Sequence, residues 1–298
     1  MEKYTLKQFN DKFPTEDACL EYLKDLRWPD GIHCQHCGEI TAHCRIQGRK
    51  VFACVRCSAH VSPCADTIFH KSSTPLRTWF YAMFLMASTR TGISAKQLER
   101  ETGVTYKTAW RMFKQIRELM AQEDGLQLFG DVEIDETYIG GKEANKHEGK
   151  KLHAGGGPVG KTTVVGMVER EGNAVVKVQP DNRADTIIPM VQDHVHPNRA
   201  VVFTDEHGAY NRLSSLGYAH WSVVHSAKQY VAGRAHTNNI EGFWSNTKRG
   251  IDGVNHVVSP KHLQGYLDSY VFRFNHRHDA APMFQTLLGQ IPSCLRAD

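Results

Sequence analysis

Two pairs of cysteines near the start of the chain limit its fold more than any other feature. Each pair encloses two residues, in Cys34-Gln-His-Cys37 and Cys54-Val-Arg-Cys57, and sixteen residues separate the pairs. This spacing is typical of a four-cysteine zinc site, because both sulfur atoms of a pair can reach one ion at about 2.3 Å. Four sulfur ligands leave no open coordination position, so we expect one structural Zn²⁺ held by Cys34, Cys37, Cys54 and Cys57.

The cysteine count also points to metal rather than to disulfides. The 298 residues include eight cysteines, nearly all before residue 65, which is too few and too clustered for a disulfide scaffold. Other residues of this segment could replace one of the four sulfur ligands, although none forms a second pair with the same gap. They are Cys44, Cys64, His33, His36, His43 and His60.

A helical period replaces this pattern between residues 75 and 122. Breaks at Gly92 and Gly103 divide it, which predicts three helices, near 75–89, 94–101 and 105–121. Ser94 and Thr105 precede the second and third helix as expected N-caps. The last two helices have the spacing of a helix-turn-helix, although an arbitrary three-helix packing unit would fit the same pattern.

Beyond residue 126 the sequence alternates between strands and helices. The strands are expected at 131–138, 162–168, 174–178 and 200–204. The helices are expected at 183–194, 236–250 and 259–274, and a further segment at 1–30 has the pattern of a short amphipathic helix. The stretch 141–161 is rich in Gly, Lys and His and has no periodicity, so we expect a loop there.

Charge is unevenly distributed along the chain, whose net charge is +4. Residues 71–125 are basic, with nine Lys and Arg and five Asp and Glu, and so are residues 221–298, with eight Lys and Arg and five Asp and Glu. Residues 126–220 are acidic, with ten Lys and Arg and thirteen Asp and Glu. Such an order fits a protein that binds a polyanion with its outer parts and keeps carboxylates in the middle, although scattered surface charge would look similar.

Nothing in the sequence predicts a membrane or secretory segment. The longest apolar run, Trp79 to Ala87, has nine residues, about half of what a transmembrane helix needs. The first ten residues lack the apolar stretch of a secretory signal, so we expect a cytoplasmic protein. Residues 155–162 match the G-x4-G-K-[ST] phosphate loop, but the residues after them are β-like where the motif needs a helix, so we expect no nucleotide cofactor.

Three carboxylates have settings that differ from those of surface charges. Asp135 lies inside an expected strand, Asp205 directly follows one, and Glu241 lies in the first turn of a helix that Asn238 or Asn239 could cap. Carboxylates so placed can converge at one edge of a sheet, where they would suit two Mg²⁺ or Mn²⁺ ions about 4 Å apart. Each acid alone is more simply a salt-bridged or edge residue, and only the combination favours a metal site.

Lys248 follows Glu241 by seven residues, which returns to nearly the same face of a helix two turns later. The acid could hold a metal ion while the lysine contacts a DNA phosphate. A solvated charged helix face would give the same spacing.

The chain resembles bacterial insertion-sequence transposases of the DDE type, in the group that has a zinc ribbon before a helix-turn-helix and a ribonuclease-H-like catalytic domain. The resemblance covers roughly residues 15–280. Besides the cysteine pairs, its main blocks are Asp135-Glu-Thr-Tyr-Ile-Gly-Gly141, Thr204-Asp205, Asn239-Ile-Glu241 and Lys248-Arg-Gly250.

The resemblance implies a multidomain α+β fold. It consists of an N-terminal helix and zinc ribbon, a helix-turn-helix DNA-binding domain, a ribonuclease-H-like α/β catalytic domain with a mixed sheet flanked by helices, and a C-terminal tail. The corresponding residues are 1–70, 71–125, 126–280 and 281–298.

The resemblance also implies an activity and its residues. Two Mg²⁺ or Mn²⁺ ions at the catalytic acids would support strand cleavage at the inverted repeats of an element and strand transfer into target DNA. Double-stranded DNA and further copies of the chain in a synaptic complex are the implied partners. The implied catalytic residues are Asp135, Asp205, Glu241 and Lys248. Some relatives have asparagine in place of the third acid, so Asn238 and Asn239 stay open as alternatives to Glu241.

Two other functions fit the same motifs. The chain could be a non-catalytic DNA-binding regulator, in which the zinc ribbon and the helix-turn-helix act and the α/β part is a scaffold. It could also be a stand-alone nuclease of the same fold, which would cleave DNA without joining the ends to a target.

Overall fold

The computed structural model describes residues 4–121, 125–141, 147–151, 159–223 and 236–292. The chain divides into two compact units, the first formed by residues 1–122 with 278–298 and the second by residues 123–277. The domain boundaries expected from the sequence stay predictions. Within the described ranges, every helix is too short or too polar to cross a membrane.

The first unit begins with two helices and a group of very short strands. The short amphipathic helix expected within residues 1–30 is confirmed, and the chain forms a further helix before Phe13 that the sequence did not predict. Thr5 and Thr15 cap the two helices with their side chains. The elements are α1 (Leu6–Lys12), α2 (Glu16–Arg27), an antiparallel pair of β1 (His33–Cys34) and β2 (Glu39–Ile40), and an antiparallel sheet of β3 (His43–Arg45), β4 (Phe52–Cys54) and β5 (His60–Val61).

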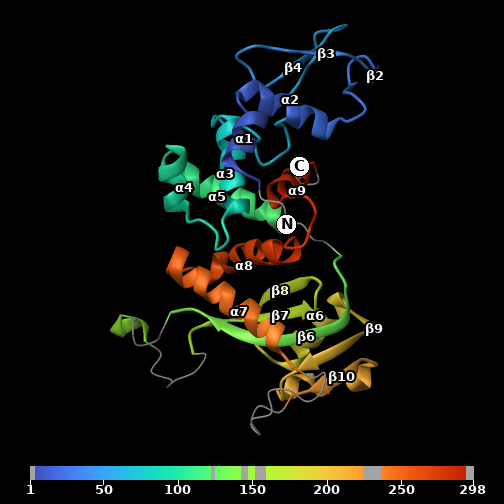
Figure 1. Ribbon diagram of the computed structural model, residues 1–298, viewed down its shortest axis with the longest axis vertical. Coiled ribbons are helices and arrows are strands. Elements are labelled where there is room, and N and C mark those ends of the chain that lie inside the picture. Colours follow the sequence, from blue (N-terminus) through green and yellow to red (C-terminus); the bar gives the residue numbers. More distant parts are fainter. Residues whose placement is uncertain (1–3, 122–124, 142–146, 152–158, 224–235, 293–298) are drawn as a thin grey trace. The chain divides into compact units, whose positions relative to one another are not determined.

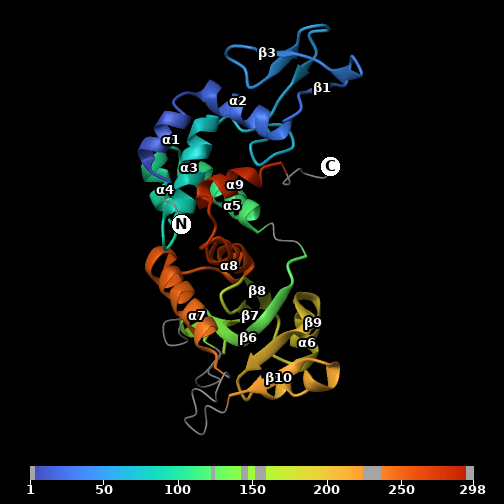
Figure 2. The ribbon, with the colours of Figure 1, turned by 45° about the vertical axis from the view of Figure 1, so that its right-hand side comes forward.

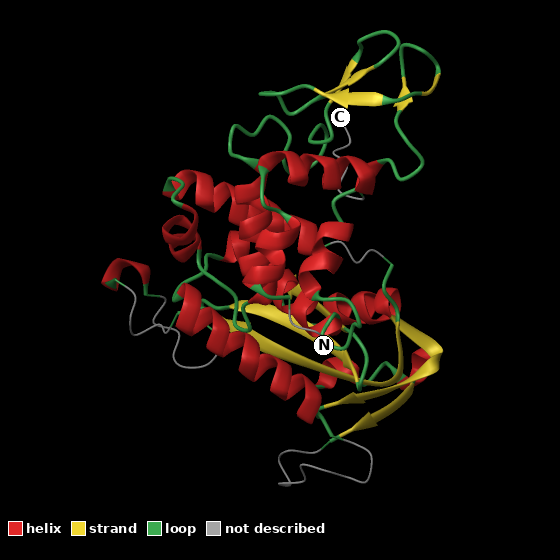
Figure 3. Cartoon of the chain, turned by 45° about the horizontal axis from the view of Figure 1, so that its top comes forward, coloured by secondary structure: helices red, strands yellow, loops and turns green. Residues whose placement is uncertain are grey.

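Three further helices confirm the pattern expected between residues 75 and 122 (Figure 3). They are α3 (Leu76–Ser88), α4 (Ala95–Thr102) and α5 (Tyr106–Met120). The Ser94 hydroxyl accepts a hydrogen bond from the Gln97 N–H at 3.1 Å, and Thr105 accepts one from the Thr108 N–H at 3.4 Å, so both expected N-caps are confirmed. Gly103 ends α4 with φ at 70°, a left-handed conformation that a side chain would strain.

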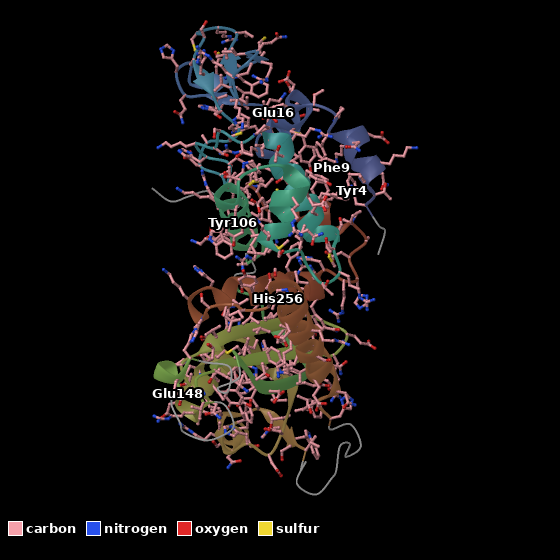
Figure 4. The ribbon with its side chains drawn as sticks, turned by 90° about the vertical axis from the view of Figure 1, so that its left-hand side faces the viewer. Tyr4, Phe9, Glu16, Tyr106, Glu148 and His256 are labelled. Carbon is pink, nitrogen blue, oxygen red and sulfur yellow. The ribbon has the colours of Figure 1, made fainter. Side chains whose placement is uncertain are left out.

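The N-terminus of α3 is capped from a distance. Glu16, at the start of α2, accepts hydrogen bonds from the backbone N–H groups of Leu76 and Arg77 at 2.7 and 2.9 Å (Figure 4). The N-cap residue itself is Pro75, whose side chain has no hydrogen-bonding atom to offer. The carboxylate therefore supplies both the missing acceptor and a negative charge at the positive end of the helix.

The end of the chain completes the core of this unit. Residues of the expected C-terminal tail form α9 (Met283–Gly289), which packs against α3. The buried Phe284 ring lies 5.9 Å from that of Phe9 and 5.7 Å from that of Phe84, measured between centroids (Figure 4 labels Phe9). Residues far apart in the sequence thus share one aromatic cluster.

The second unit is built on one mixed sheet, as expected. Its strand order is β10-β9-β6-β7-β8, with β6 in the centre. The strands are β6 (Leu128–Ile139), β7 (Thr162–Glu169), β8 (Ala174–Gln179), β9 (Val195–Thr204) and β10 (Ala219–Ser222). β7 runs antiparallel to both β6 and β8, whereas β9 is parallel to both β6 and β10. The sequence did not predict β10, which is short and largely exposed.

Helices cover both faces of this sheet (Figures 1 and 2). On one face lie α7 (Asn238–Gly250) and α8 (Pro260–Asn275), and on the other lies α6 (Ala184–His194). Alternating residues of β7 follow this division, because Val164 is buried with the α7 and α8 residues and Val165 with those of α6. The two faces of β6 are separated in the same way, which decides where its acidic side chains point.

One glycine of β7 allows α7 to lie directly on the sheet. A Cβ atom at Gly166 would lie 2.5 Å from Cζ2 of Trp244 and 3.3 Å from Cδ1 of Ile240. The indole N–H of Trp244 donates a hydrogen bond to Asp135 at 3.1 Å. The absence of a side chain at Gly166 therefore lets the Trp244 ring reach across β7 to β6.

We expect Gly166→Ala to destabilise the chain by about 1–3 kcal/mol, because the added methyl group displaces the Trp244 ring. Denaturant unfolding followed by Trp fluorescence measures the effect. Gly242→Ala is the matched control: it lies on α7 with no atom within 4 Å of the added Cβ, and alanine in a helix should stabilise it. Equal stability of Gly166→Ala and the wild type would contradict this account of the packing.

Candidate functional site

The four paired cysteines converge in the first unit. Their sulfur atoms all lie within 4.8 Å of one another. The Sγ atoms of Cys34 and Cys57 are 3.6 Å apart, and those of Cys37 and Cys54 are 3.9 Å apart, close to the roughly 3.8 Å between sulfur ligands of a tetrahedral zinc ion. The Thr41 hydroxyl donates a hydrogen bond to Cys54 at 3.2 Å and lowers the pKa of that thiol to about 5, which favours the metal-binding thiolate.

The other possible ligands of this segment stay outside the group. Among the described residues, Cys44 is exposed, and Cys64 is buried where desolvation raises its thiol pKa to about 11. The ring of His33 contacts the Gly38 carbonyl through Nε2, and that of His43 contacts the Thr41 carbonyl through Nδ1. The alternative ligand sets left open by the sequence gain no support from this geometry.

Two of the predicted acids meet at one edge of the large sheet. The parallel pairing of β6 with β9 aligns Glu133 with Phe203, so Asp135 and Asp205 are in register two residues further on, where β9 ends. Oxygen atoms of Asp135, Asp205 and Glu136 all lie within 4.8 Å of one another. Glu136 could not be predicted as a member of this group, because alternation along a strand would turn it away from Asp135.

Burial and mutual repulsion dominate the electrostatics of this carboxylate group, Asp135, Glu136 and Asp205. Burial raises the pKa of Asp135 to about 6; the Asp205 charge adds to this shift, and the Trp244 N–H opposes it. Burial likewise raises the pKa of Glu136 to about 7, which the Tyr210 hydroxyl opposes and the charges of Asp205 and Asp135 increase. Both side chains are thus costly to ionise unless a cation compensates them.

Glu241 and Lys248 both lie exposed on α7. Glu241 is outside the 4.8 Å carboxylate group, and its carboxylate accepts a hydrogen bond from the Thr237 hydroxyl at 2.9 Å. Its charge nevertheless contributes to the raised pKa of Asp135. The structure therefore brings Asp135 and Asp205 together and leaves Glu241 near this pair but not in contact with it.

A second acid that the sequence did not predict fixes the start of α7. Glu133 is fully buried, and its Oε2 atom accepts the backbone N–H groups of Asn239 and Ile240 at 2.8 and 3.0 Å. Its Oε1 atom accepts hydrogen bonds from the Asn239 side chain at 2.8 Å and from Arg170 at 2.7 Å. The expectation that Asn238 or Asn239 caps this helix is wrong, because the acceptor comes from β6, more than one hundred residues earlier.

The position of Glu133 also determines where Glu241 lies. Glu133 and Asp135 are two residues apart on β6 and therefore face the same side of the sheet. By binding the first turn of α7, Glu133 holds that turn, and Glu241 within it, beside Asp135. In the sequence, the only local indication that Glu133 holds α7 beside Asp135 is the alternation of acids at positions 133 and 135 of an expected strand.

Comparison with known proteins agrees with this geometry. Residues 14–60 match the transposase zinc-ribbon domain, and residues 127–275 match the ISXO2-like transposase domain. The chain belongs to this family of transposases. The resemblance to insertion-sequence transposases with an N-terminal zinc ribbon is thereby confirmed, and the matched regions contain both the cysteine group and the acids.

Two individual proteins are similar to this member of the family. An uncharacterized protein in the transposable element ISH50 of Halobacterium salinarum is 27% identical over 274 residues, which cover 88% of this chain and 91% of that protein. A chain in the crystal structure of a pre-cleavage Mos1 transpososome shares 12% identity and covers 74% of this chain and 78% of its own length. Its TM-score of 0.27 is too low to establish a common fold.

We expect Cys57→Ser to lose zinc, because three sulfur atoms and a hydroxyl bind the ion far more weakly than four thiolates. Cys44→Ser is the matched control, since Cys44 is exposed in the same segment and lies outside the group. Elemental analysis of the purified proteins should find one zinc per chain in the wild type and in Cys44→Ser. Loss of zinc from the control would contradict the assignment of the ligands.

Without added magnesium or manganese, we expect the chain to lose stability as the pH rises from about 4 to 7. The folded chain keeps the proton of Asp135 up to about pH 6 and that of Glu136 up to about pH 7, whereas the unfolded chain releases both near pH 4, so rising pH favours unfolding. Asp135→Asn removes one of these groups and should gain up to about 3 kcal/mol over the wild type at pH 7 but not at pH 4.

Denaturant unfolding at the two pH values measures this difference. The control is Glu206→Gln, which removes an exposed carboxylate next to Asp205 and should follow the wild type at both pH values. An Asp135→Asn variant no more stable than the wild type at pH 7 would show that burial does not penalise this carboxylate.

Proposed function

We propose that the chain is a DNA transposase that cleaves DNA strands at the ends of its element and joins them to target DNA. One observation carries the proposal: within the region that matches the transposase domain, Asp135 and Asp205 meet at the edge of the sheet. Both steps are in-line displacements at phosphorus that differ only in the attacking oxygen, so one site can perform both.

The acids fit hard divalent cations. The ligand atoms at this edge are carboxylate oxygens, which Mg²⁺ and Mn²⁺ prefer, and the burial of Asp135 makes its charge costly without a cation. We assign the metal-binding role to Asp135, Asp205 and Glu241, with two ions in the active site. Bound ions would neutralise charge at the scissile phosphate and assist the attacking and leaving oxygens.

The remaining groups position these acids and the DNA. The Trp244 N–H fixes the orientation of the Asp135 carboxylate, and the Thr237 hydroxyl fixes that of Glu241. Lys248, exposed two turns after Glu241, is assigned to a DNA phosphate. Glu241 is a better metal ligand than Asn238 or Asn239, because a carboxylate binds Mg²⁺ more strongly than a neutral amide does.

The same proposal assigns roles to the other parts of the chain. The mixed sheet with helices on both faces supports a ribonuclease-H-like arrangement for the second unit. In the first unit, α4 and α5 are proposed as a helix-turn-helix that binds the inverted repeats, because the start of α5 exposes Tyr106, Lys107 and Arg111 (Figure 4 labels Tyr106). The four cysteines are proposed to hold one structural zinc, and the active complex to contain more than one copy of the chain.

The phosphate-loop match does not enter this function. Most of its glycine-rich part lies outside the described residues, and the residues that follow form β7. A strand cannot present the backbone N–H groups that the start of a helix offers to phosphates.

The decisive experiment uses DNA that contains the inverted repeats flanking the gene, together with a supercoiled target. We expect Asp205→Asn to reduce strand cleavage by about 100-fold or more while binding of the repeat DNA is retained, because the site loses one preorganised charge. Glu206→Gln removes the neighbouring exposed carboxylate as a matched control and should keep activity.

The outcomes also separate the competing functions. Full retention of every DNA-dependent activity by Asp205→Asn would favour a non-catalytic regulator. Cleavage of the repeat ends by the wild type without any strand-transfer product would favour a stand-alone nuclease.

A further inference from the structure

Glu136 departs from the pattern of the strand that carries it. It follows Asp135 on β6, so its side chain leaves the strand on the opposite face, where Ile134 and Tyr210 are buried. An apolar residue would suit that place. A carboxylate occupies it instead, and one of its oxygens lies within 4.8 Å of oxygens of both Asp135 and Asp205.

The Glu136 side chain is buried without adequate partners. It is 7% exposed, and its Oε1 atom makes no hydrogen bond within the described part of the chain. The Tyr210 hydroxyl, also buried, faces this carboxylate closely enough to oppose the rise of its pKa, but it does not form a hydrogen bond of ordinary distance and angle with it. A buried carboxylate with an unsatisfied oxygen costs several times the energy of one missing hydrogen bond, unless a cation binds it.

The nearest side chain that can carry a positive charge, His207, forms no hydrogen bond with Glu136. Nδ1 of His207 lies 3.5 Å from Glu136 Oε1 and likewise makes no hydrogen bond within the described residues. On the other side of the ring, the Asn182 amide nitrogen lies 3.3 Å from Nε2, a contact in which Nε2 accepts. His207 then offers Nδ1–H toward Glu136, as outer residues do when they orient a metal-bound carboxylate.

No Lys or Arg within the described residues forms an ion pair with Asp135, Glu136 or Asp205. Three carboxylates thus converge on one point without a Lys or Arg among the described residues to pair with them, and the Glu136 side chain is more than nine-tenths buried with one oxygen unsatisfied. Such a set stabilises a bound divalent ion and is destabilising without one.

We propose that Glu136 is a ligand of the divalent ion that Asp135 and Asp205 hold, and that it supplies the third carboxylate there. Glu241, which lies outside the 4.8 Å group on α7, then serves the second ion together with Asp135. This proposal rests on the proposed function, because it presupposes a metal site at Asp135 and Asp205. Four acids then bind the two ions: Asp135, Glu136, Asp205 and Glu241. The assignment from the family resemblance uses only Asp135, Asp205 and Glu241.

The test is Mn²⁺ binding to the full-length, zinc-loaded chain, followed by the electron paramagnetic resonance signal of free Mn²⁺ during titration. We expect Glu136→Gln to weaken the tighter Mn²⁺ site at least about tenfold. Asp135→Asn and Asp205→Asn should weaken the same site, and Glu206→Gln, the exposed charge control, should bind like the wild type. The melting temperature of each variant without Mn²⁺ is measured in parallel.

The possible results separate the two proposals. If Asp135→Asn and Asp205→Asn lose Mn²⁺ while Glu136→Gln binds like the wild type, the role of Glu136 is refuted and the proposed metal site stands. If all three bind like the wild type, the proposed metal site itself is refuted. A lower melting temperature of Glu136→Gln with unchanged Mn²⁺ affinity means a structural role only, which also refutes the inference.

A second variant decides the question if Glu136→Gln does not fold. Glu136→Asp keeps the negative charge but withdraws both oxygens from the group by the length of one methylene. A tenfold weaker Mn²⁺ site in this variant supports ligation by Glu136, and unchanged affinity refutes it.

Discussion

The hydrogen bonds of the buried Glu133 carboxylate determine the geometry of the acidic site. They join the central strand β6 to the start of α7 and to Arg170, so that one strand carries both an acid of the site and the anchor for the helix that bears Glu241. Breaking a buried network of this kind leaves unpaired polar groups and an uncompensated charge. The same device recurs in the first unit, where Glu16 caps α3 from α2.

The site itself combines features that oppose folding. Asp135 and Asp205 face each other because parallel strands end at the same edge, and Glu136 adds a third carboxylate. The compensating contributions come from outside the group: apolar packing on both faces of the sheet and the contact that Gly166 permits for Trp244. The scaffold therefore bears the electrostatic cost of holding the acids together.

Local patterns in the sequence predicted what depends on local interactions. The helices between residues 75 and 122, their Ser94 and Thr105 caps and the convergence of the cysteine pairs follow from spacing alone. The meeting of Asp135 with Asp205 follows from their places along two strands. The helices and their caps need no knowledge of partners elsewhere in the chain, because periodicity and turn residues determine them.

The features that could not be predicted all require a distant partner. Glu133 looks like an ordinary strand acid until α7 is placed against it, and Glu136 looks like an outward-facing residue until β9 is seen to end beside it. The edge strand β10 exists only through its pairing with β9. Propensity and periodicity describe neighbours along the chain and therefore miss such contacts.

The place of α9 has a consequence for how the protein is made. The chain leaves its first unit after residue 122 and returns to it only at residue 278, where Phe284 fills the aromatic cluster around Phe9 and Phe84. During synthesis the ribosome therefore releases the whole second unit before the first can close its core. The first unit is synthesised first but completes its core last. Until α9 is made, the aromatic side chains of this unit stay exposed to solvent or to a chaperone.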